Sequence, residues 1–583
     1  MATVMLLCIS CLLYALLYVR PWHKLFPKPY PGIPYNEVSA RRIFGDVRDI
    51  SSAIRAAGGF SDAILAITTR KLDTPIAQVL FPILRKPLIV VDDPHEVEDI
   101  LWRRQREFDV AQTSLDLMAP MFPHGWVSQF TTPQLKAEKQ LWAGTMATGF
   151  LQKAVAPLIY TSTLELVHLW RLRQITEDDP IPFDVAQDFR SASLDIIWAA
   201  ITGDNPGVLK LEIDKLPHPV RSKTQMPKES CGRRTNQEIH DAVSLMEGVA
   251  SLNDVISRNA ASLFPKWAQK LETYTRRHHK FRAIVGNAVS RMVRRVDERF
   301  RDFNPAELED DWPSTCMMDI VLRRRVLEAK KTGKPLGDLA KDQVLLDQVF
   351  TLLIAGYGNT ANTLTWFVKF MEAHQEVQSK LRAELRAAFP HAASATGSPS
   401  SDEIIRADIP YLDAVCEETL RYSGNSRGNL RQALVDTEIL GCRVPRGAEV
   451  LLHFHVDQSP PPVDESRRSV TSRAAMARVG DGLRGAAGQR LGQFDPSRWL
   501  SEGGDKFNGT ALPRLSFGGG YRGCFGKNLA MMQFRIFAVL LILHFEFLEL
   551  PGELVGMGGS ERLFWQPDKA FAKIRCLIDR DGL

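Results

Sequence analysis

The residues most able to do chemistry gather around one cysteine near the C-terminal end of this 583-residue chain. Cys524 follows Phe517 and Arg522 in a glycine-rich run with the pattern F-x-x-G-x-R-x-C-x-G. The glycines permit a tight turn that can approach a bulky planar ligand, and Arg522 can pair with an anionic carboxylate. The apolar stretch from Leu529 to Phe545 predicts a buried helix whose positive dipole end favours the thiolate form of the sulfur. Such a thiolate can bind iron as an axial ligand.

Two charged motifs lie upstream of this turn. Glu418 and Arg421 form the pattern E-x-x-R, so they share one face of a predicted helix and can pair. Arg498 belongs to the second motif, the run from Phe494 to Trp499, which reads F-x-P-x-R-W. A lone E-x-x-R pair is common on solvated helices and indicates little by itself. It becomes informative here because the other motifs follow it in a fixed order.

In this order the motifs resemble those of the cytochrome P-450 family, the haem-thiolate monooxygenases, and in particular microsomal members from fungal secondary metabolism. The resemblance runs from about residue 30 to the C-terminus and implies a mainly α fold with a minor β region. It implies haem b, iron protoporphyrin IX, as the cofactor. Cys524 would be the metal ligand, and Phe517 and Arg522 would be among the residues that bind the cofactor.

The resemblance gives the charged motifs a structural role. In the family, the arginine that corresponds to Arg498 joins the pair that corresponds to Glu418 and Arg421, and together they lock the segment behind the haem. Removing one of the three should leave a buried charge unpaired and cost folding or haem retention.

Two further cations are cofactor-binding candidates. The stretch from Leu135 to Ala156 is similar to the family helix that normally turns a tryptophan and basic residues toward a haem propionate. Lys139 lies near the basic position, and Leu135 stands where the tryptophan often is. The alternative for Lys139 is a solvated surface lysine. Arg431 opens a segment that resembles a family motif, R-x-a-x-x-D, and is predicted to bind a propionate.

The apolar segment from Asp347 to Phe370 resembles the family helix that crosses the distal face of the haem. Within it, the run A-G-Y-G-N-T begins at Ala355 and Gly356. This small pair is expected to line the substrate pocket, to make room for dioxygen and to loosen the helix ladder.

The next residues of this run depart from the family pattern. Gly358 stands where the family has an acid, and Asn359 stands at the usual alcohol position. Thr360 matches the following residue and shares a helix face with Gly356, so Thr360 and Asn359 are the candidates for proton delivery, directly or through ordered water. The alternative is that Thr360 only bonds back to a helix carbonyl.

The segment that follows the E-x-x-R helix matches one that lines the substrate pocket in the family. Here it is unusually polar, with Asn425 and Asn429 as the candidate substrate contacts. Their amides would suit a small oxygenated substrate, such as a partly decorated polyketide or terpenoid.

The N-terminal stretch from Ala2 to Val19 carries no charge and, as a helix, would reach roughly 27 Å, close to the thickness of the hydrocarbon core. Basic residues follow it, so the positive-inside bias places the rest of the chain in the cytosol. The sequence therefore predicts a single transmembrane anchor at 1–20, a proline-rich hinge at 21–36 and a catalytic domain at 37–583, attached to the endoplasmic reticulum membrane. The rival is a cleaved signal peptide, which the missing basic n-region and cleavage site disfavour.

Composition limits the partners. A net charge of +5, from 73 basic and 68 acidic residues, does not suggest nucleic acid. Eight cysteines in a chain of this length form no disulfide framework. Because no flavin or nucleotide-binding extension is evident, electrons are expected from NADPH through a separate cytochrome P-450 reductase, with cytochrome b5 as a possible second donor.

The predicted activity is insertion of one oxygen atom from O2 into a small organic substrate, in secondary-metabolite biosynthesis. Two alternatives stay open. The missing acid at Gly358 suits an isomerase or dehydratase of the same fold that needs neither O2 nor reductase, and a non-catalytic haem-binding protein is the second. The stretch from Ser459 to Gly492 is longer than expected before the F-x-P-x-R-W motif, and it is interpreted as a tolerated surface insertion.

Overall fold

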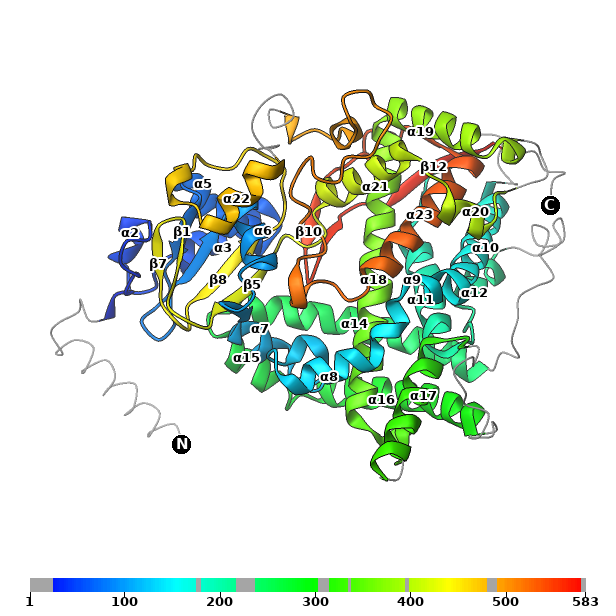
Figure 1. The fold of residues 1–583 in the computed structure, drawn as a ribbon, viewed down its shortest axis with the longest axis horizontal. Coiled ribbons are helices and arrows are strands. Elements are labelled where there is room, and N and C mark those ends of the chain that lie inside the picture. Colours follow the sequence, from blue (N-terminus) through cyan, green and yellow to red (C-terminus); the bar gives the residue numbers. More distant parts are fainter. Residues whose placement is uncertain are drawn as a thin grey trace.

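The structure is a computed structural model that describes residues 25–174, 180–216, 236–301, 314–333, 337–393, 398–479 and 490–577. The predicted membrane anchor at 1–20 and the first residues of the proline-rich hinge lie outside these ranges. Helices make up most of the described chain; the largest sheet lies with several short helices at one side of the molecule, whereas the C-terminal strands lie among the long helices (Figure 1). This arrangement agrees with the mainly α fold that the sequence predicts.

The described helices are α2 (Glu37–Ala40), α3 (Val47–Ala57), α4 (Phe60–Ile67), α5 (Thr69–Leu72), α6 (Pro94–Trp102), α7 (Gln112–Met118), α8 (Pro133–Trp142), α9 (Thr148–Phe150), α10 (Ala156–Gln174), α11 (Ala186–Thr202), α12 (Val208–Asp214), α14 (Asn236–Ala260), α15 (Pro265–Glu272), α16 (Arg276–Arg301), α17 (Met317–Thr332), α18 (Gln343–Ala373), α19 (Gln375–Ala388), α20 (Ser401–Arg406), α21 (Pro410–Ser423), α22 (Val470–Val479) and α23 (Lys527–His544).

The described strands are β1 (Ile76–Val79), β2 (Leu88–Val91), β3 (Phe108–Val110), β4 (Phe183–Asp184), β5 (Gly428–Ala433), β6 (Thr437–Ile439), β7 (Cys442–Val444), β8 (Glu449–His453), β9 (Phe545–Leu548), β10 (Gly559–Glu561), β11 (Trp565–Pro567) and β12 (Phe571–Cys576). The largest sheet has the order β1-β2-β8-β5-β3. Its β2–β8 pair is parallel, with Val90 opposite Leu451, and its other pairs are antiparallel. A smaller sheet, β4-β12-β9, lies beside the C-terminal end of α18.

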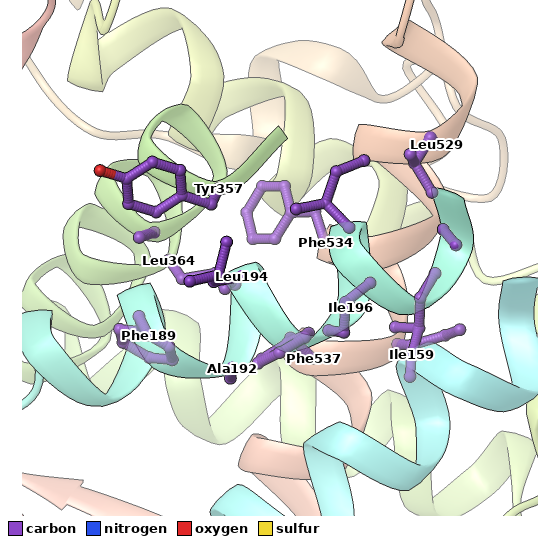
Figure 2. Close-up of a cluster of buried hydrophobic side chains, with 14 of the residues drawn as sticks. Ile159, Phe189, Ala192, Leu194, Ile196, Tyr357, Leu364, Leu529, Phe534 and Phe537 are labelled. Atoms are coloured by element: carbon purple, nitrogen blue, oxygen red, sulfur yellow. The ribbon is translucent and has the colours of Figure 1, made fainter. Parts of the chain in front are cut away.

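The long helix α18 runs through the middle of the helical part and packs against α11, α21 and α23. Asp342 caps its first turn by accepting a hydrogen bond from the amide of Leu345 at 3.1 Å. Buried apolar side chains from α10, α11, α18 and α23 interlock around it (Figure 2), and each leucine, isoleucine and phenylalanine among them contributes roughly 1.5–3 kcal/mol through burial. Those labelled are Ile159, Phe189, Ala192, Leu194, Ile196, Tyr357, Leu364, Leu529, Phe534 and Phe537. This core fixes α18 relative to α23, the helix that follows the cysteine turn.

One predicted helix is interrupted. The stretch from Leu135 to Ala156 does not form a single helix, because α8 ends at Trp142 and a short 3₁₀ turn follows. The guanidinium of Arg324 on α17 donates to the carbonyls of Gln140 and Leu141 at 2.7 Å, which satisfies the last turn of α8. Lys139 therefore lies in the last turn of α8, while the residues beyond Trp142 turn away toward α10.

A buried histidine at the end of α23 gives the fold a testable pH dependence. His544 accepts a hydrogen bond at Nδ1 from Arg171, which can only donate, so its Nε2 carries the proton and faces the Ser398 hydroxyl at 2.8 Å. Burial first, and then the Arg171 charge, lower the pKa of His544 to about 3. The unfolded chain takes up this proton near pH 6.5, so stability falls as the pH drops below that value.

We expect His544→Gln to flatten this pH dependence. Between about pH 6.5 and pH 5 the wild-type histidine should cost about 2 kcal/mol of stability that the neutral glutamine does not lose. Thermal unfolding measured at both pH values tests this expectation. His279→Gln is the matched control, since His279 is exposed. Equal pH slopes for wild type and His544→Gln would contradict the buried neutral histidine.

Candidate functional site

The cysteine turn closes on itself before α23 begins. The amide of Cys524 donates to the carbonyl of Phe517 at 2.8 Å, and the amide of Gly523 donates to that of Gly520 at 3.0 Å. Gly518 and Gly520 have φ values of +61° and +63°, which side chains other than glycine rarely adopt. The motif glycines therefore make a tight turn, as the sequence predicts.

The close approach that these glycines permit is to helix α6. A Cβ on Gly519 would lie 2.6 Å from the indole of Trp102, and one on Gly520 would lie 2.4 Å from the carbonyl oxygen of Leu101. Gln105, just beyond α6, accepts a hydrogen bond from the amide of Tyr521 at 2.6 Å. The sequence predicted an approach to a planar ligand, whereas two of the glycines face α6.

The surroundings of Cys524 push its thiol in opposite directions. Burial by the crowded turn raises its pKa, whereas the Gly526 amide, Lys139 and Lys527 act to lower it, in that order. The burial effect is the larger of these, so the net effect raises the pKa of the thiol. The cysteine is nevertheless exposed on one side, so water moderates the effect. A bound metal cation would deprotonate the sulfur outright.

Three cations lie around the turn. Lys139 donates to the carbonyl of Tyr521 at 3.0 Å, and desolvation followed by the nearby Arg522 charge lowers its pKa to about 8. Arg431 on β5 is buried, and desolvation followed by Arg522 lowers its pKa to about 10. Arg522 pairs with Asp109 at 3.3 Å. Asp109 also accepts hydrogen bonds from the amide and hydroxyl of Thr131, so one carboxylate serves several donors.

These residues fit the haem that the resemblance implies. A porphyrin of this type carries two anionic propionates. Two of the three cations beside the turn, Lys139 and Arg431, have pKa values lowered by desolvation and by the neighbouring Arg522 charge, so an anionic group there would stabilise their charged forms. Cys524 offers the axial sulfur, and Arg431, Arg522 and Lys139 would hold the propionates. The Phe517 ring packs against the hydrophobic core, with the Lys527 ammonium 5.8 Å from its centroid. Phe517 would therefore offer an apolar surface to the cofactor.

The structural triad forms as the motifs indicate. The Glu418 carboxylate accepts from Arg421 at 2.7 and 2.8 Å and from the Nε of Arg498 at 3.0 Å. It also accepts from the indole of Trp499 and the amide of Asp495, both at 2.8 Å. Because both oxygens of this fully buried carboxylate are shared, α21 is tied to the segment that leads into the cysteine turn.

The small pair on α18 faces two directions. Ala355 is exposed, while a Cβ on Gly356 would come within 2.5 Å of Ile197, so this glycine permits the close contact of α11 with α18. A Cβ on Gly358 would meet nothing within 4 Å. The hydroxyl of Thr360 donates to the carbonyl of Gly356 at 3.0 Å, which is the back-bonded arrangement.

The polar segment before β5 meets α18. Asn425 donates through its amide nitrogen to the Thr363 hydroxyl at 2.6 Å and to the Asn359 carbonyl at 3.3 Å. The side-chain oxygens of Asn359 and Asn425 are buried and have no hydrogen-bond partner among the described residues. Asn429 instead accepts a hydrogen bond from Arg431 at 2.8 Å, so it orients a residue that is a candidate for binding a haem propionate.

Sequence reasoning missed Asp109, Gln105 and Thr363. Each acts through a partner far away in the sequence, and no local motif marks them. Asp109 lies within a short strand, β3, and could have been found only by asking which carboxylate offsets the charge of Arg522.

An open cavity of about 370 Å³ lies beside Cys524, and Lys136, Lys139 and Lys527 are among its lining residues. Among the described residues, one helix is long and apolar enough to cross a membrane, namely α23. Because α23 is mostly buried in the core, it belongs to the globular fold.

Comparisons with known proteins agree with this geometry. The Cytochrome P-450 family model matches residues 78–456 and 492–571. The chain is 30% identical over 566 residues to the cytochrome P-450 monooxygenase xilC of Penicillium crustosum, covering 95% of this chain and 93% of that protein. It is 28% identical over 599 residues to the monooxygenase TRI13 of Fusarium sporotrichioides, covering 97% and 98%. A crystal structure of a cytochrome P-450 covers 94% of this chain and 100% of its own, with a TM-score of 0.64 and 18% identity, and so shares the fold. The chain therefore belongs to the cytochrome P-450 family of monooxygenases, which bind haem through a cysteine thiolate.

Proposed function

We propose that this protein inserts one oxygen atom from O2 into a small organic substrate, with electrons that originate from NADPH. The observation that carries the proposal is the exposed Cys524 in a closed turn at the start of α23, flanked by the buried Arg431 and the partly buried Lys139 and Arg522. The haem, when bound, supplies the oxidising chemistry. The protein anchors it through Cys524, pairs with its propionates and positions the substrate.

The electrons would come from a separate membrane-bound NADPH–cytochrome P-450 reductase, with cytochrome b5 as a possible second donor. The lysine-lined cavity beside Cys524 supports this proposal, because Lys136 and Lys527 offer positive charge to an acidic partner close to the sulfur.

The substrate would carry hydrogen-bond donors. The unpaired side-chain oxygens of Asn359 and Asn425 lie buried where α18 meets the segment before β5, and leaving such oxygens unpaired costs about 1–3 kcal/mol each. A substrate hydroxyl that reaches either oxygen would offset that cost. An oxygenated polyketide or terpenoid intermediate has this chemistry, and Ala355 would line the same pocket from the exposed side of α18.

Membrane attachment is part of the proposal. Residues 1–20 would anchor the chain in the endoplasmic reticulum membrane, 21–36 would serve as the hinge, and 37–583 would form the cytosolic catalytic domain. Helix α15 supports this proposal, because it exposes Trp267 and Leu271 with Lys266 and Lys270 beside them, a pattern typical of helices at a membrane surface.

Proton delivery is assigned to Thr360, with help from Asn359. Thr360→Val keeps the volume but removes the hydroxyl, so we expect product formed per NADPH consumed to fall about tenfold or more, with peroxide rising in its place. Product and peroxide are measured together with reductase present. Thr365→Val is the matched control, because Thr365 also bonds back to a carbonyl of α18, at 2.8 Å. An unchanged yield in Thr360→Val would remove Thr360 from the relay.

The experiment that tests the proposed function is turnover in ¹⁸O₂ with and without NADPH and reductase. The proposal expects product only with both, carrying one labelled oxygen. The open space at Gly358, where the family has an acid, favours one alternative, an isomerase or dehydratase of the same fold. That alternative requires product without NADPH and without label. A haem protein that gives no product with any oxygenated candidate substrate would instead be a non-catalytic binder.

A further inference from the structure

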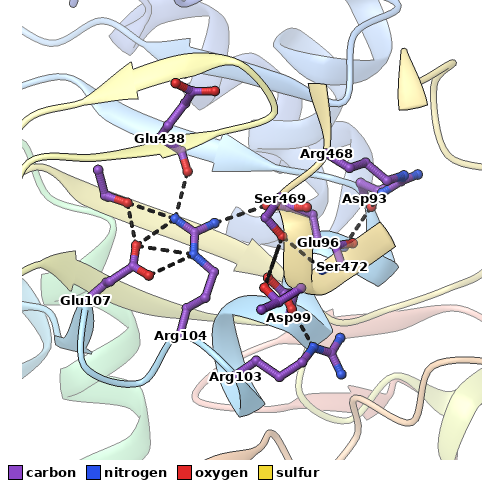
Figure 3. A network of polar contacts seen from close by, with 12 residues as sticks. Asp93, Glu96, Asp99, Arg103, Arg104, Glu107, Glu438, Arg468, Ser469 and Ser472 are labelled. Carbon is purple, nitrogen blue, oxygen red and sulfur yellow. Dashed lines mark hydrogen bonds and ion pairs between the residues drawn. The ribbon is translucent and has the colours of Figure 1, made fainter. Parts of the chain in front are cut away.

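Residues 457–491 fall between the two matched parts of the family model, and the described part of this insertion is anchored. It forms a 3₁₀ turn, Glu465–Arg467, and then α22, which packs on α6. Figure 3 shows side chains of this segment meeting those of α6. The sequence suggested that this segment is a tolerated surface insertion, which does not explain why its described part makes buried contacts.

Arg468 forms a buried ion pair at the start of α6. Its guanidinium forms two hydrogen bonds with the carboxylate of Asp93, one of them at 2.8 Å, and both residues are buried. A third bond runs from its Nε to Glu465 at 2.8 Å. Asp93 is also the N-cap of α6, because it accepts from the amide of Glu96 at 2.8 Å. Arg468 thus neutralises the residue that starts α6.

The insertion also holds the last turns of α6. The hydroxyls of Ser469 and Thr471 donate to the same oxygen of Asp99, at 2.6 and 2.8 Å, and Arg103 bonds the other oxygen (Figure 3). Asp99 is fully buried, so these donors replace the water that it would otherwise bind. Two carboxylates, near the beginning and the end of α6, therefore depend on residues from the insertion.

The C-terminal end of α6 is the part that touches the cysteine turn. Trp102 and the Leu101 carbonyl lie so close to Gly519 and Gly520 that a Cβ on either glycine would clash. Gln105 then holds the amide of Tyr521. Helix α6 therefore lies between the insertion and the turn that carries Cys524.

We propose that residues 465–473 act as a brace that positions α6 against the cysteine turn, with Arg468 as its central positioning residue. This inference rests on the proposed role of Cys524 as haem ligand. Without Arg468, the buried Asp93 carboxylate loses its counter-charge, and the helix start must shift toward water. The tight contact of α6 with Gly519 and Gly520 then loosens, and the sulfur loses its fixed position.

The test compares two arginines that each pair with a buried carboxylate in the full-length, haem-loaded protein. Arg468→Ala removes the brace. Arg173→Ala is the matched control, because Arg173 also forms two hydrogen bonds with a buried carboxylate, Asp188, which lies on α11 and not on α6. The readouts are melting temperature and the rate at which the carbon monoxide complex of the reduced protein changes from its thiolate-type Soret band to a band without thiolate.

We expect Arg468→Ala to lose the thiolate-type band about tenfold faster than Arg173→Ala for an equal fall in melting temperature, equivalent to about 1.4 kcal/mol. Arg468→Lys, which keeps the charge but not the paired geometry, should lie between wild type and Arg468→Ala. Equal band loss in the two alanine variants at equal melting temperature would overturn the proposal, because Arg468 would then act only on stability.

A milder variant decides the matter if Arg468→Ala does not fold. Ser469→Ala combined with Thr471→Val removes both hydroxyls from Asp99, whose charge stays paired with Arg103, and it should also speed band loss relative to wild type. An unchanged rate in this double variant would count against the brace. A wild-type protein that never shows the thiolate-type band would instead defeat the proposed function, which is a different outcome from a brace that has no effect.

Discussion

Replacement of Cys524 by serine is expected to abolish turnover and the thiolate-type spectrum together. The turn would still close, because the amide of residue 524 bonds the Phe517 carbonyl whatever its side chain. A serine hydroxyl, however, is not an anionic sulfur ligand, so the electronic character of the bound iron changes. We expect activity to fall by about a thousandfold or more, to the background of the assay. Activity is measured with NADPH and reductase, and ligation by the Soret band of the carbon monoxide complex.

Cys576→Ser is the control for this variant. Cys576 is also exposed, but it lies at the end of β12. It should keep both activity and spectrum. Full turnover by Cys524→Ser, or equal losses in the two variants, would refute Cys524 as the ligand.

Replacement of Glu418 by glutamine should give the largest loss of stability. The wild-type carboxylate accepts hydrogen bonds from Arg421, Arg498 and Trp499 and is fully buried. Glutamine fills the same volume but leaves two buried guanidinium groups without a counter-charge. We expect a loss on the order of 3–5 kcal/mol, enough to leave little haem-bound protein. Yield of haem-bound protein and its half-life at a fixed elevated temperature measure this effect.

The adjacent residue provides a matched control. Glu417 also lies on α21 and is buried, but its partner Arg514, 3.1 Å away, reaches partly into water. Glu417→Gln should therefore cost well under half as much as Glu418→Gln. If the two variants lose haem and stability equally, the triad has no special role and general burial of a glutamate explains the effect.

Local motifs account for the parts of the site that the sequence predicted well. Glu418 and Arg421 pair because one helix turn separates them, and α23 begins close to where the apolar stretch after Cys524 does. The family match and the shared fold confirm the haem-thiolate class and the mainly α architecture. The roles of Thr360, Asn359 and Asn425 remain predictions, because their described hydrogen bonds are to protein atoms.

Long-range contacts account for what the sequence did not reveal. Gly519 and Gly520 were expected to face a planar ligand, but they accommodate Trp102 and Leu101 of α6, more than 400 positions earlier. Burial by the folded turn raises the pKa of Cys524, an effect that the local sequence around the cysteine does not indicate. Both effects depend on which distant segments pack around the turn, and no local pattern encodes that.

The contacts of the insertion also could not be predicted from the local sequence. Its composition, rich in arginine, glycine and alanine, is typical of a surface loop. Nothing near Arg468 in the sequence indicates that its charge is buried against Asp93, because the partner belongs to a helix 375 positions away. The gap in the family match shows that the segment lies outside the part shared with the family model, but only the folded structure reveals which residues it contacts.

The difference spectrum of the reduced protein with and without carbon monoxide, recorded on membranes that contain it, tests the central claim most directly. The account predicts a strongly red-shifted Soret band, which arises when a cysteine thiolate lies opposite the carbon monoxide on the iron. A band typical of histidine-ligated or thiol-ligated haem, or no haem signal from well-folded protein, would contradict the assignment of Cys524 and the function built on it.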